Sequence, residues 1–348
     1  MEAIAIGDLH GTDATGKGGI AKYVQNYDEV IFEEADRAVE WARERGIKNV
    51  FLLGDLCESP RMSYDSMLGL VSFFARHEDM QFYVILGNHD LFSDDPKIGH
   101  SLQIVMAMYG KENVTFITKP KTIAVDGAPV RFLPYPHDDF DPKALNVFHK
   151  EVYGSKGDSG RPMKDDSLSK SKAVCVAGHL HTAHKVRNTY YPGTLAQKNF
   201  GEKTDKYFAH IDFTSADSHS IEFIPFEPKY LLHTIVLNDR QDLKQIPKGQ
   251  FNLVKLVIAD GADVSGADWS GKSNIVEIKN FKSKEELRAV LTEDLSDGQA
   301  LTFDVDEFFS VWLDQSNFSP ALLQSIKRVR SRVRKKALAA KSATEVKE

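Results

Sequence analysis

Histidine, aspartate and asparagine residues recur directly after short apolar segments in the first 181 residues. They form the groups Gly7-Asp8-Leu9-His10, Gly54-Asp55, Gly87-Asn88-His89-Asp90, His149 and Gly178-His179-Leu180-His181. Imidazole, carboxylate and amide oxygen together suit divalent ions such as Mn²⁺, Fe²⁺ or Zn²⁺, and the lack of thiolates argues against a structural zinc cage. The candidate ligands are Asp8, His10, Asp55, Asn88, His149, His179 and His181. These are too many for one ion, so we expect two ions about 3.5–4 Å apart that share a carboxylate and activate a water for attack on a phosphoester.

The groups differ in how much each indicates alone. Asp8 and His10 form a common D-x-H pair, and Gly54-Asp55 is an ordinary turn dipeptide. Gly87-Asn88-His89-Asp90 is more specific, because a simple turn has no need of four such residues in succession. The metal prediction therefore depends on the whole series, in order and each after a predicted strand.

An alternation of strands and helices positions the first groups. Apolar runs predict strands at Ala3–Ile6, Asn49–Leu53 and Phe82–Leu86, and helical spacing predicts helices at Tyr27–Arg45 and Tyr64–Arg76. Ligands of layered α/β proteins lie beyond the carboxyl ends of the strands, so we expect the polar groups to meet at one edge of the sheet.

From Val114 onward the pattern becomes β-rich. Strands are predicted at Val114–Ile117, Thr122–Val125, Val130–Leu133, Asn146–Phe148, Ala173–Ala177, Lys185–Tyr190, Tyr207–Asp212 and His219–Ile224. They imply a second sheet, and the expected fold class is α/β, a layered sandwich of two mixed sheets. The polar, aperiodic stretch Gly154–Lys172 is predicted to be a surface loop.

Two further parts are expected after Pro225 and Pro228. A small α/β capping domain would hold strands at Leu232–Leu237, Leu253–Ile258 and Asn274–Ile278 and a helix at Lys284–Leu291. A tail helix would begin at Ser319-Pro320, with an apolar stripe from Leu322 to Ala337 and basic residues opposite. The predicted divisions are residues 1–225, the catalytic body, residues 226–285, the cap, and residues 286–348, the tail.

Composition narrows the class of protein. The length of 348 residues suits two or three domains, and 42% hydrophobic with 27% charged residues is ordinary for a globular chain. No apolar run approaches the roughly 18 residues of a membrane span, and the start lacks a signal-peptide pattern, so a soluble cytoplasmic protein without membrane contact is expected. The two cysteines, Cys57 and Cys175, are expected to be buried or reduced thiols.

The charge is unevenly distributed. Residues 320–348 hold nine Lys or Arg and two Glu, a local charge of +7 within a chain of net charge −6. The rest of the chain is therefore acidic, at −13, and its acids can contribute to binding cations.

The motif series resembles the calcineurin-like metallophosphoesterases, whose pattern is D-x-H, G-D, G-N-H-D/E, H and G-H-x-H in this order. Within that superfamily the chain looks like the DNA-repair nucleases of the SbcD and meiotic-recombination-eleven type, including bacteriophage recombination endonuclease subunits. The motifs span Asp8 to His181, and Tyr191-Pro192-Gly193-Thr194 followed by Phe200-Gly201-Glu202 extends the likeness.

The resemblance implies roles for individual residues. One ion would be bound by Asp8, His10 and His181, the other by Asn88, His149 and His179, with Asp55 bridging. His89 would act as general acid toward the leaving oxygen, and Asp90 would orient its ring. The ions would be Mn²⁺, or alternatively Mg²⁺.

The resemblance also implies partners. The chain would be a DNA exonuclease and endonuclease acting in double-strand break repair or recombination. Residues 300–340 would dock onto an SbcC-type coiled-coil ATPase. The amphipathic pattern of the tail leaves two other interpretations open, a contact with nucleic acid and a solvated helix packed on its own domain. A homodimer is expected through the helices around Tyr64–Arg76 and Ile98–Tyr109. A phage-encoded chain would act in the host cytoplasm.

Two departures and two alternatives stay open. Many members carry a histidine at the position of Glu58, and His137 competes with His149 as a ligand. A phosphatase typically has arginines after the second motif and before G-N-H, which this chain lacks, so a phosphodiesterase is favoured. Another phosphodiesterase or phosphatase of the superfamily, or a catalytically silent scaffold, remains the alternative.

Overall fold

The structure is a computed structural model that describes residues 1–93, 99–157, 173–263 and 274–280. The predicted helix at Lys284–Leu291, the tail and most of the predicted loop at Gly154–Lys172 lie outside the described residues. None of the described helices is long and apolar enough to cross a membrane.

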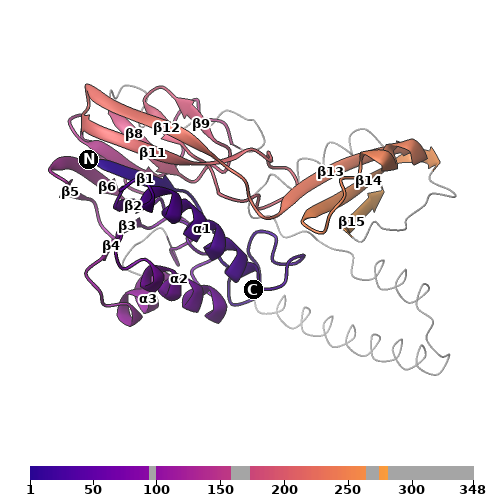
Figure 1. Cartoon of the computed structure of the whole chain (residues 1–348), viewed down its shortest axis with the longest axis horizontal. Helices are drawn as coiled ribbons and strands as arrows, with labels where there is room; N and C mark the ends of the chain where they lie inside the picture. Colours follow the sequence, from indigo (N-terminus) through magenta and orange to yellow (C-terminus); the bar gives the residue numbers. More distant parts are fainter. Residues whose placement is uncertain (94–98, 158–172, 264–273, 281–348) are drawn as a thin grey trace, which may run out of the picture. The chain divides into compact units, whose positions relative to one another are not determined.

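The first sheet has six strands in the order β12-β11-β1-β2-β3-β4 (Figure 1). They are β1 (Glu2–Ile6), β2 (Asn49–Leu52), β3 (Gln81–Ile85), β4 (Val114–Ile117), β11 (Lys206–Ser215) and β12 (Ser218–Phe226). Strands β1 to β4 run parallel to one another, β11 runs antiparallel to β1, and β12 runs antiparallel to β11. Ile6 pairs with Leu52 and Leu52 with Val84, so the parallel strands end level with one another.

The second sheet has the order β5-β6-β7-β8-β10-β9. Its strands are β5 (Lys121–Val125), β6 (Ala128–Leu133), β7 (Leu145–His149), β8 (Val174–Gly178), β9 (His184–Val186) and β10 (Thr189–Tyr191). The prediction of one strand at Lys185–Tyr190 is wrong: Arg187 adopts a left-handed conformation, φ 55°, and turns the chain between two strands. The layered sandwich of two mixed sheets is otherwise confirmed.

Apolar cores fill the space on both sides of the first sheet. Ala3, Phe51 and Ile85 pack with Val130, Phe132 and Val147 of the second sheet. The alternate residues of the same strands, among them Ile4, Leu52 and Val84, pack against the helices. Strands that are buried on both faces are continuous apolar runs, which is why the sequence shows β1 to β3 so clearly.

Three helices cover the outer face of the first sheet: α1 (Tyr27–Arg43), α2 (Tyr64–Arg76) and α3 (Leu102–Met108) (Figure 1). Helix α2 begins where predicted because the Ser63 side chain accepts a hydrogen bond from Ser66 N at 2.9 Å, which caps the helix. Helix α1 ends near Gly46, whose φ of 75° favours glycine.

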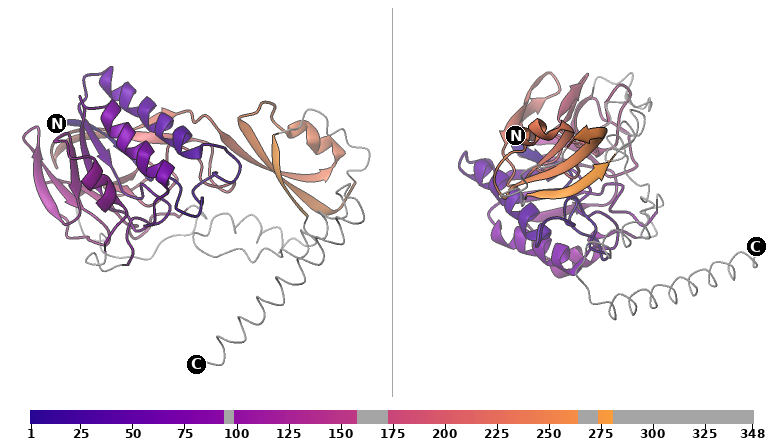
Figure 2. Two further views of the ribbon diagram at one scale, coloured as in Figure 1. Left: turned by 90° about the horizontal axis from the view of Figure 1, so that it is seen from below. Right: turned by 90° about the vertical axis from the view of Figure 1, so that its right-hand side faces the viewer.

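A third sheet consists of three parallel strands, β13 (Leu231–Asp239), β14 (Asn252–Asp263) and β15 (Ile275–Asn280), with the short 3-10 helix η1 (Arg240–Gln245) beside β13 (Figure 2). It belongs to the same compact unit, Met1–Asp297, as the two large sheets. The predicted boundaries at residues 225 and 285 stay predictions. Cys57 and Cys175 are buried free thiols, as expected.

Candidate metal centre

The predicted ligands come from five strand ends, three in the first sheet and two in the second. Asp8 and His10 follow β1, Asp55 follows β2, Asn88 follows β3, His149 ends β7, and His179 and His181 follow β8. Because parallel strands in register end at one edge, each sheet presents its polar groups together. Packing of one sheet on the other then brings the two edges into contact.

Asn88, His149 and His179 lie around Asp55. The His149 Nε2 atom is 3.0 Å from Asp55 Oδ2 and 3.0 Å from Asn88 Oδ1, and His179 Nδ1 is 2.9 Å from the same Asn88 oxygen. Donor atoms of Asp55, His149 and His179 all lie within 4.8 Å of one another. His137, the alternative to His149, belongs to neither of the possible ion-binding groups found among the described residues. The structure therefore assembles the residues predicted for one ion.

The residues predicted for the other ion also meet at Asp55. His10 Nε2 is 3.9 Å from Asp55 Oδ2, and the His10 and His181 rings lie edge to face with centroids 5.1 Å apart. Asp8 accepts a hydrogen bond from the backbone N–H of His179 at 2.9 Å. All seven predicted ligands thus belong to one cluster, and Asp55 Oδ2 is the atom close to histidines of both sets.

The cluster fits divalent cations. His10 Nε2 makes no hydrogen bond within the described part of the chain, although the residue is only 2% exposed, whereas His10 Nδ1 faces Glu58 Oε2 at 3.1 Å. A buried polar atom without a partner costs about 1–3 kcal/mol, and a bound cation would remove that cost. The set of imidazole, carboxylate and amide donors suits Mn²⁺ and similar ions.

Asp55 and His149 form a buried pair. Burial alone would raise the pKa of the Asp55 carboxyl, but the adjacent His149, with His10 and His89, lowers that pKa well below its usual range. Conversely, burial alone would lower the pKa of His149, but Asp55 raises it. Asp55 is therefore ionised and supplies a fixed negative charge at the centre of the cluster.

Backbone conformation at the strand ends is unusual. His10, Asp55 and His179 have φ values of 50°, 48° and 82°, in the left-handed region. Such residues cost about 1–3 kcal/mol each and persist when their surroundings hold them. Each turns the chain sharply after a strand, which lets its side chain enter the cluster.

Two glycines allow the strand ends to approach one another. A Cβ atom on Gly87 would lie 2.1 Å from Asp55 Oδ1, and a Cβ atom on Gly178 would lie 2.5 Å from Leu53 O and 2.8 Å from Asp8 Oδ1. Any larger residue would have to displace a predicted ligand or the backbone beside it. The glycines of the motifs are therefore part of the geometry of the site.

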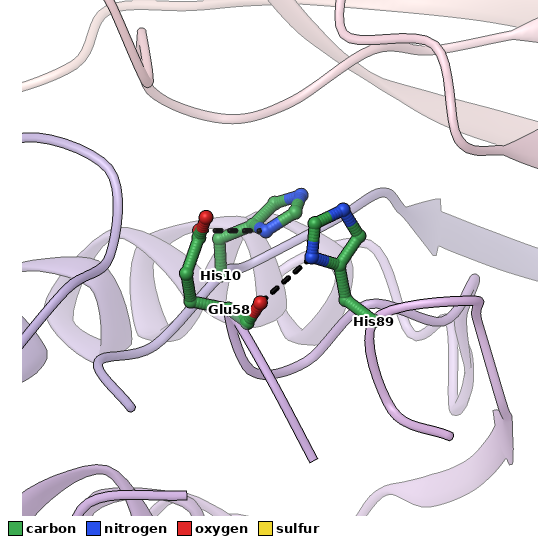
Figure 3. A group of neighbouring side chains, drawn as sticks. All are labelled: His10, Glu58 and His89. Atoms are coloured by element: carbon green, nitrogen blue, oxygen red, sulfur yellow. Dashed lines mark hydrogen bonds and ion pairs between the residues drawn. The ribbon is translucent and has the colours of Figure 1, made fainter. Parts of the chain in front are cut away.

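His89 lies next to this cluster, but the group that orients its ring is not Asp90, as the resemblance implied. Its Nδ1 is 2.7 Å from the backbone carbonyl of Glu58, which can only accept, so Nδ1 carries the proton (Figure 3). The Asp90 carboxylate instead accepts from Gly87 N at 2.9 Å and Ser101 Oγ at 3.1 Å. Within the described residues it is the Glu58 carbonyl, and not Asp90, that orients the His89 ring.

Three glutamates next to the predicted ligands were not among the predicted site residues. Glu58 Oε2 is 3.1 Å from His10 Nδ1, Glu151 Oε2 is 3.1 Å from His179 Nε2, and Glu202 Oε1 is 3.1 Å from His181 Nδ1. Glu58 also forms a possible ion-binding group with His10 and His89. The only sequence signals were the departure from histidine at Glu58 and the Phe200-Gly201-Glu202 group.

Glu202 is the most enclosed of these glutamates. Its other carboxylate oxygen accepts from the buried Lys206 Nζ at 2.6 Å, and Lys206 also donates to Thr194 Oγ1 at 2.9 Å. Burial alone would raise the pKa of Glu202, but Lys206 and His181 lower it to about 2. The carboxylate is therefore ionised at neutral pH.

Glu202→Gln should change how stability depends on pH. The folded-state pKa lies below the usual 4.5, so the stabilisation is complete above pH 4.5 and is lost as the pH falls toward 2. Between pH 5 and pH 3 the wild-type chain should lose about 2 kcal/mol more free energy of unfolding than the variant. Urea unfolding of both proteins in a chelator measures this, and a difference that stays constant with pH would contradict it.

A groove of about 770 Å³ lies elsewhere, between α1, α2 and the loop before α1. Asp28, Glu29, Asp36 and Asp65 contribute to its lining, and none of the predicted ligands does. The buried Asp28 connects this region to the site, because it accepts a hydrogen bond from Thr12 N at 2.8 Å, two residues after His10. The groove itself offers no metal-ligand cluster among its described residues.

Comparison with known proteins agrees with this chemistry. Residues 1–220 match the family described as Calcineurin-like phosphoesterase. Over 137 residues the chain is 24% identical to "Putative phosphoesterase 244L" of Invertebrate iridescent virus 6, which covers 35% of this chain and 48% of the viral protein. The chain thus spans about half the length of the curated relative it matches.

Three of the solved structures that match the chain share little sequence with it. The hypothetical protein PH1004 from Pyrococcus horikoshii OT3 is 12% identical, with a TM-score of 0.37, over 65% of this chain and 88% of that one. The protein TT1561 of Thermus thermophilus is 11% identical, with a TM-score of 0.36, over 64% and 98%. The purple acid phosphatase PPD1 from yellow lupin (Lupinus luteus) seeds is 13% identical, with a TM-score of 0.38, over 65% and 51%.

Proposed function

The chain belongs to the calcineurin-like phosphoesterase family, whose members use divalent metal ions, and from this premise we propose that it is a metal-dependent DNA nuclease that hydrolyses phosphodiester bonds. The observation that carries the proposal is the single buried cluster in which Asp55 Oδ2 lies 3.0 Å from His149 Nε2 and 3.9 Å from His10 Nε2. One carboxylate oxygen close to histidines of both sets is what a shared ligand of two ions requires.

Seven residues would hold the ions. Asp8, His10, His181 and Asp55 would hold one, and Asn88, His149, His179 and Asp55 the other, with Mn²⁺ as the expected ion and Mg²⁺ as the alternative. When bound, such a pair supplies charge neutralisation at the phosphate and activation of the attacking water.

His89 would supply the proton that the leaving group needs. Because the Glu58 carbonyl holds the proton on Nδ1, the proton given to the leaving oxygen would be the second one, on Nε2 of the doubly protonated ring, and the ring would become neutral with Nδ1 still protonated. The ring lies edge to face with the His10 ring, at 4.9 Å between centroids, so it is next to the cluster. This placement supports a role as general acid.

The charges around the cluster favour a diester. A phosphomonoester dianion is usually bound by guanidinium groups, and within the described residues no arginine forms a hydrogen bond or ion pair with the seven predicted ligands. A phosphodiester carries a single negative charge, so it needs fewer positively charged side chains close to the phosphate. DNA as the polymer follows from the resemblance to repair nucleases.

The test is hydrolysis by the purified full chain with Mn²⁺, Mg²⁺ or EDTA. End-labelled single- and double-stranded DNA, bis-p-nitrophenyl phosphate and p-nitrophenyl phosphate would be compared. We expect Mn²⁺-dependent cleavage of DNA and of the diester, and little of the monoester. Preference for the monoester would favour a phosphatase, and no hydrolysis with bound Mn²⁺ would favour a silent scaffold.

His89→Gln should separate proton transfer from ion binding. We expect kcat on DNA to fall by about 10²-fold while Mn²⁺ binding is unchanged, because the ring is not one of the predicted ligands. His137→Gln is the matched control, a histidine of the described chain outside the cluster, and should keep full activity. Loss of Mn²⁺ binding in the His89 variant would mean that His89 is a ligand instead.

We also propose two partners. A second copy of the chain would dock on α2 and α3, where Tyr64 and Leu68, and Ile104 and Met108, are exposed apolar pairs at helical spacing. Sedimentation equilibrium of the full chain tests this.

An SbcC-type ATPase would bind residues 300–340, which lie outside the described residues. Co-purification with and without residues 319–348 tests that proposal.

A further inference from the structure

The four predicted ligand histidines are held from outside the cluster in different ways. His149 Nδ1 is 2.6 Å from the Leu53 carbonyl, and His179 Nε2 is 3.1 Å from Glu151 Oε2. His10 and His181 each have Nδ1 at 3.1 Å from a glutamate, Glu58 and Glu202 respectively. The ion predicted at Asp8, His10 and His181, called the Asp8 ion below, therefore has a carboxylate behind each of its two histidines.

A carboxylate behind a histidine has a definite effect. An ionised carboxylate only accepts hydrogen bonds, so the nitrogen facing it carries the proton and the other nitrogen is the donor to a metal. The contact also fixes the ring orientation, and loss of such a partner typically weakens metal binding by about 10–100-fold. For His10 and His181 this selects Nε2, and His10 Nε2 is the nitrogen 3.9 Å from Asp55 Oδ2.

The two supports of the Asp8 ion are not equal. Glu202 is buried and is itself fixed by Lys206 at 2.6 Å and by Asn199 Nδ2 at 3.2 Å. Glu58 is 31% exposed and meets His10 at ion-pair distance without the alignment of a hydrogen bond (Figure 3). Glu202 is thus the stronger support and Glu58 the weaker one.

Within the described residues, the other ion has no fully buried carboxylate behind either of its histidines. Leu53 offers a neutral carbonyl to His149, and the Glu151 and His179 side chains are 26% and 24% exposed. Solvent screens a contact of this kind, so it contributes less than a buried one. The two halves of the cluster therefore differ in how firmly their histidines are held.

We infer that Glu202 and Glu58 are positioning residues that make the Asp8–His10–His181 half the tighter of two unequal ion sites. This inference rests on the proposed metal-dependent function and adds an order of loading to it. When Mn²⁺ is scarce, the chain holds one ion, at Asp8, His10 and His181. Hydrolysis begins only at the higher Mn²⁺ concentration at which the second ion binds at Asn88, His149 and His179.

The test uses the full chain, freed of metal by chelation, with Mn²⁺ alone as probe. Isothermal titration calorimetry, with free Mn²⁺ followed by electron paramagnetic resonance, should resolve two binding events at least about 10-fold apart in Kd. Glu202→Gln should weaken the tighter event by about 10–100-fold and change the weaker one less than about 3-fold. Glu151→Gln should weaken only the weaker event, and the exposed Glu112→Gln is the matched control.

Three outcomes can be distinguished: misfolding of a variant, failure of the inference about unequal sites, and failure of the proposed metal-dependent function. Glu202→Gln leaves Lys206 without its carboxylate partner, so circular dichroism is used to check that this variant folds. Glu58→Gln changes a more exposed residue and should weaken the same tighter binding event by a smaller factor. Two equal events in the wild-type chain, or equal weakening of both by Glu202→Gln, would overturn the inference while two bound ions and DNA cleavage still support the proposed function. A wild-type chain that binds no Mn²⁺ overturns the proposed function itself.

Discussion

Replacing Asp55 with asparagine is expected to lower Mn²⁺-dependent hydrolysis by about 10⁴-fold, equivalent to about 5.5 kcal/mol of transition-state stabilisation, and to weaken the binding of both ions. Asp55 Oδ2 is the oxygen close to histidines of both predicted sets, and its carboxyl is ionised. Asparagine has the same size and tolerates the left-handed φ of 48°, so the fold should persist while the charge is lost. The other oxygen can still accept the 2.8 Å hydrogen bond from His89 N.

A matched control exists in the turn between β5 and β6. Asp126 has a φ of 46° and lies outside the cluster, so Asp126→Asn makes the same chemical change on the same backbone conformation. Hydrolysis, Mn²⁺ titration and thermal unfolding would be measured for both variants. If Asp55→Asn bound two Mn²⁺ ions with wild-type affinity, the assignment of Asp55 as the shared ligand would have to be abandoned.

Replacing Gly87 with alanine is expected to reduce activity by at least about 10²-fold and to cost about 2–4 kcal/mol of unfolding free energy, although no polar group is removed. The added Cβ would lie 2.1 Å from Asp55 Oδ1 and 2.5 Å from Asp55 N. Both neighbours belong to a buried turn, so either Asp55 or the end of β3 must move. A displacement of about 1 Å at a reacting site is enough for a loss of this size.

Gly110→Ala is the control for this variant. No atom lies within 4 Å of the Cβ that alanine would add there, and the position is exposed. Its stability should stay within about 0.5 kcal/mol of wild type. Full activity and unchanged urea unfolding of Gly87→Ala would show that the close approach of the two strand ends is not required.

Periodicity predicted the regular elements well where local signals agree with packing. Tyr64–Arg76 has its boundaries as predicted, because the Ser63 cap and the apolar stripe act together. The split of Lys185–Tyr190 into β9 and β10 was missed, because an arginine in the left-handed region carries no turn signal. The short helix η1 was also missed, since its six residues are too few to show a period.

The cluster could be predicted from residue type, order and position after strands, but its outer contacts could not. Glu202 reaches His181 from 21 positions further along the chain, and Glu151 reaches His179 across the gap between β7 and β8. Such contacts arise when the sheets pack and leave no spacing in the sequence. Glu58 was noticed as a departure from the family pattern, yet its contact with His10 depends on the turn after β2.

The origin of the ligands in both sheets bears on how the protein is made in the cell. About 170 residues separate Asp8 from His181, and a ribosome moving at roughly 5–20 residues per second needs about 10–35 s to synthesise that interval. Until then the nascent chain holds scattered histidines and aspartates with little affinity for a cation. Binding of ions by the predicted ligands would therefore be a late step in biogenesis, after the fold has formed.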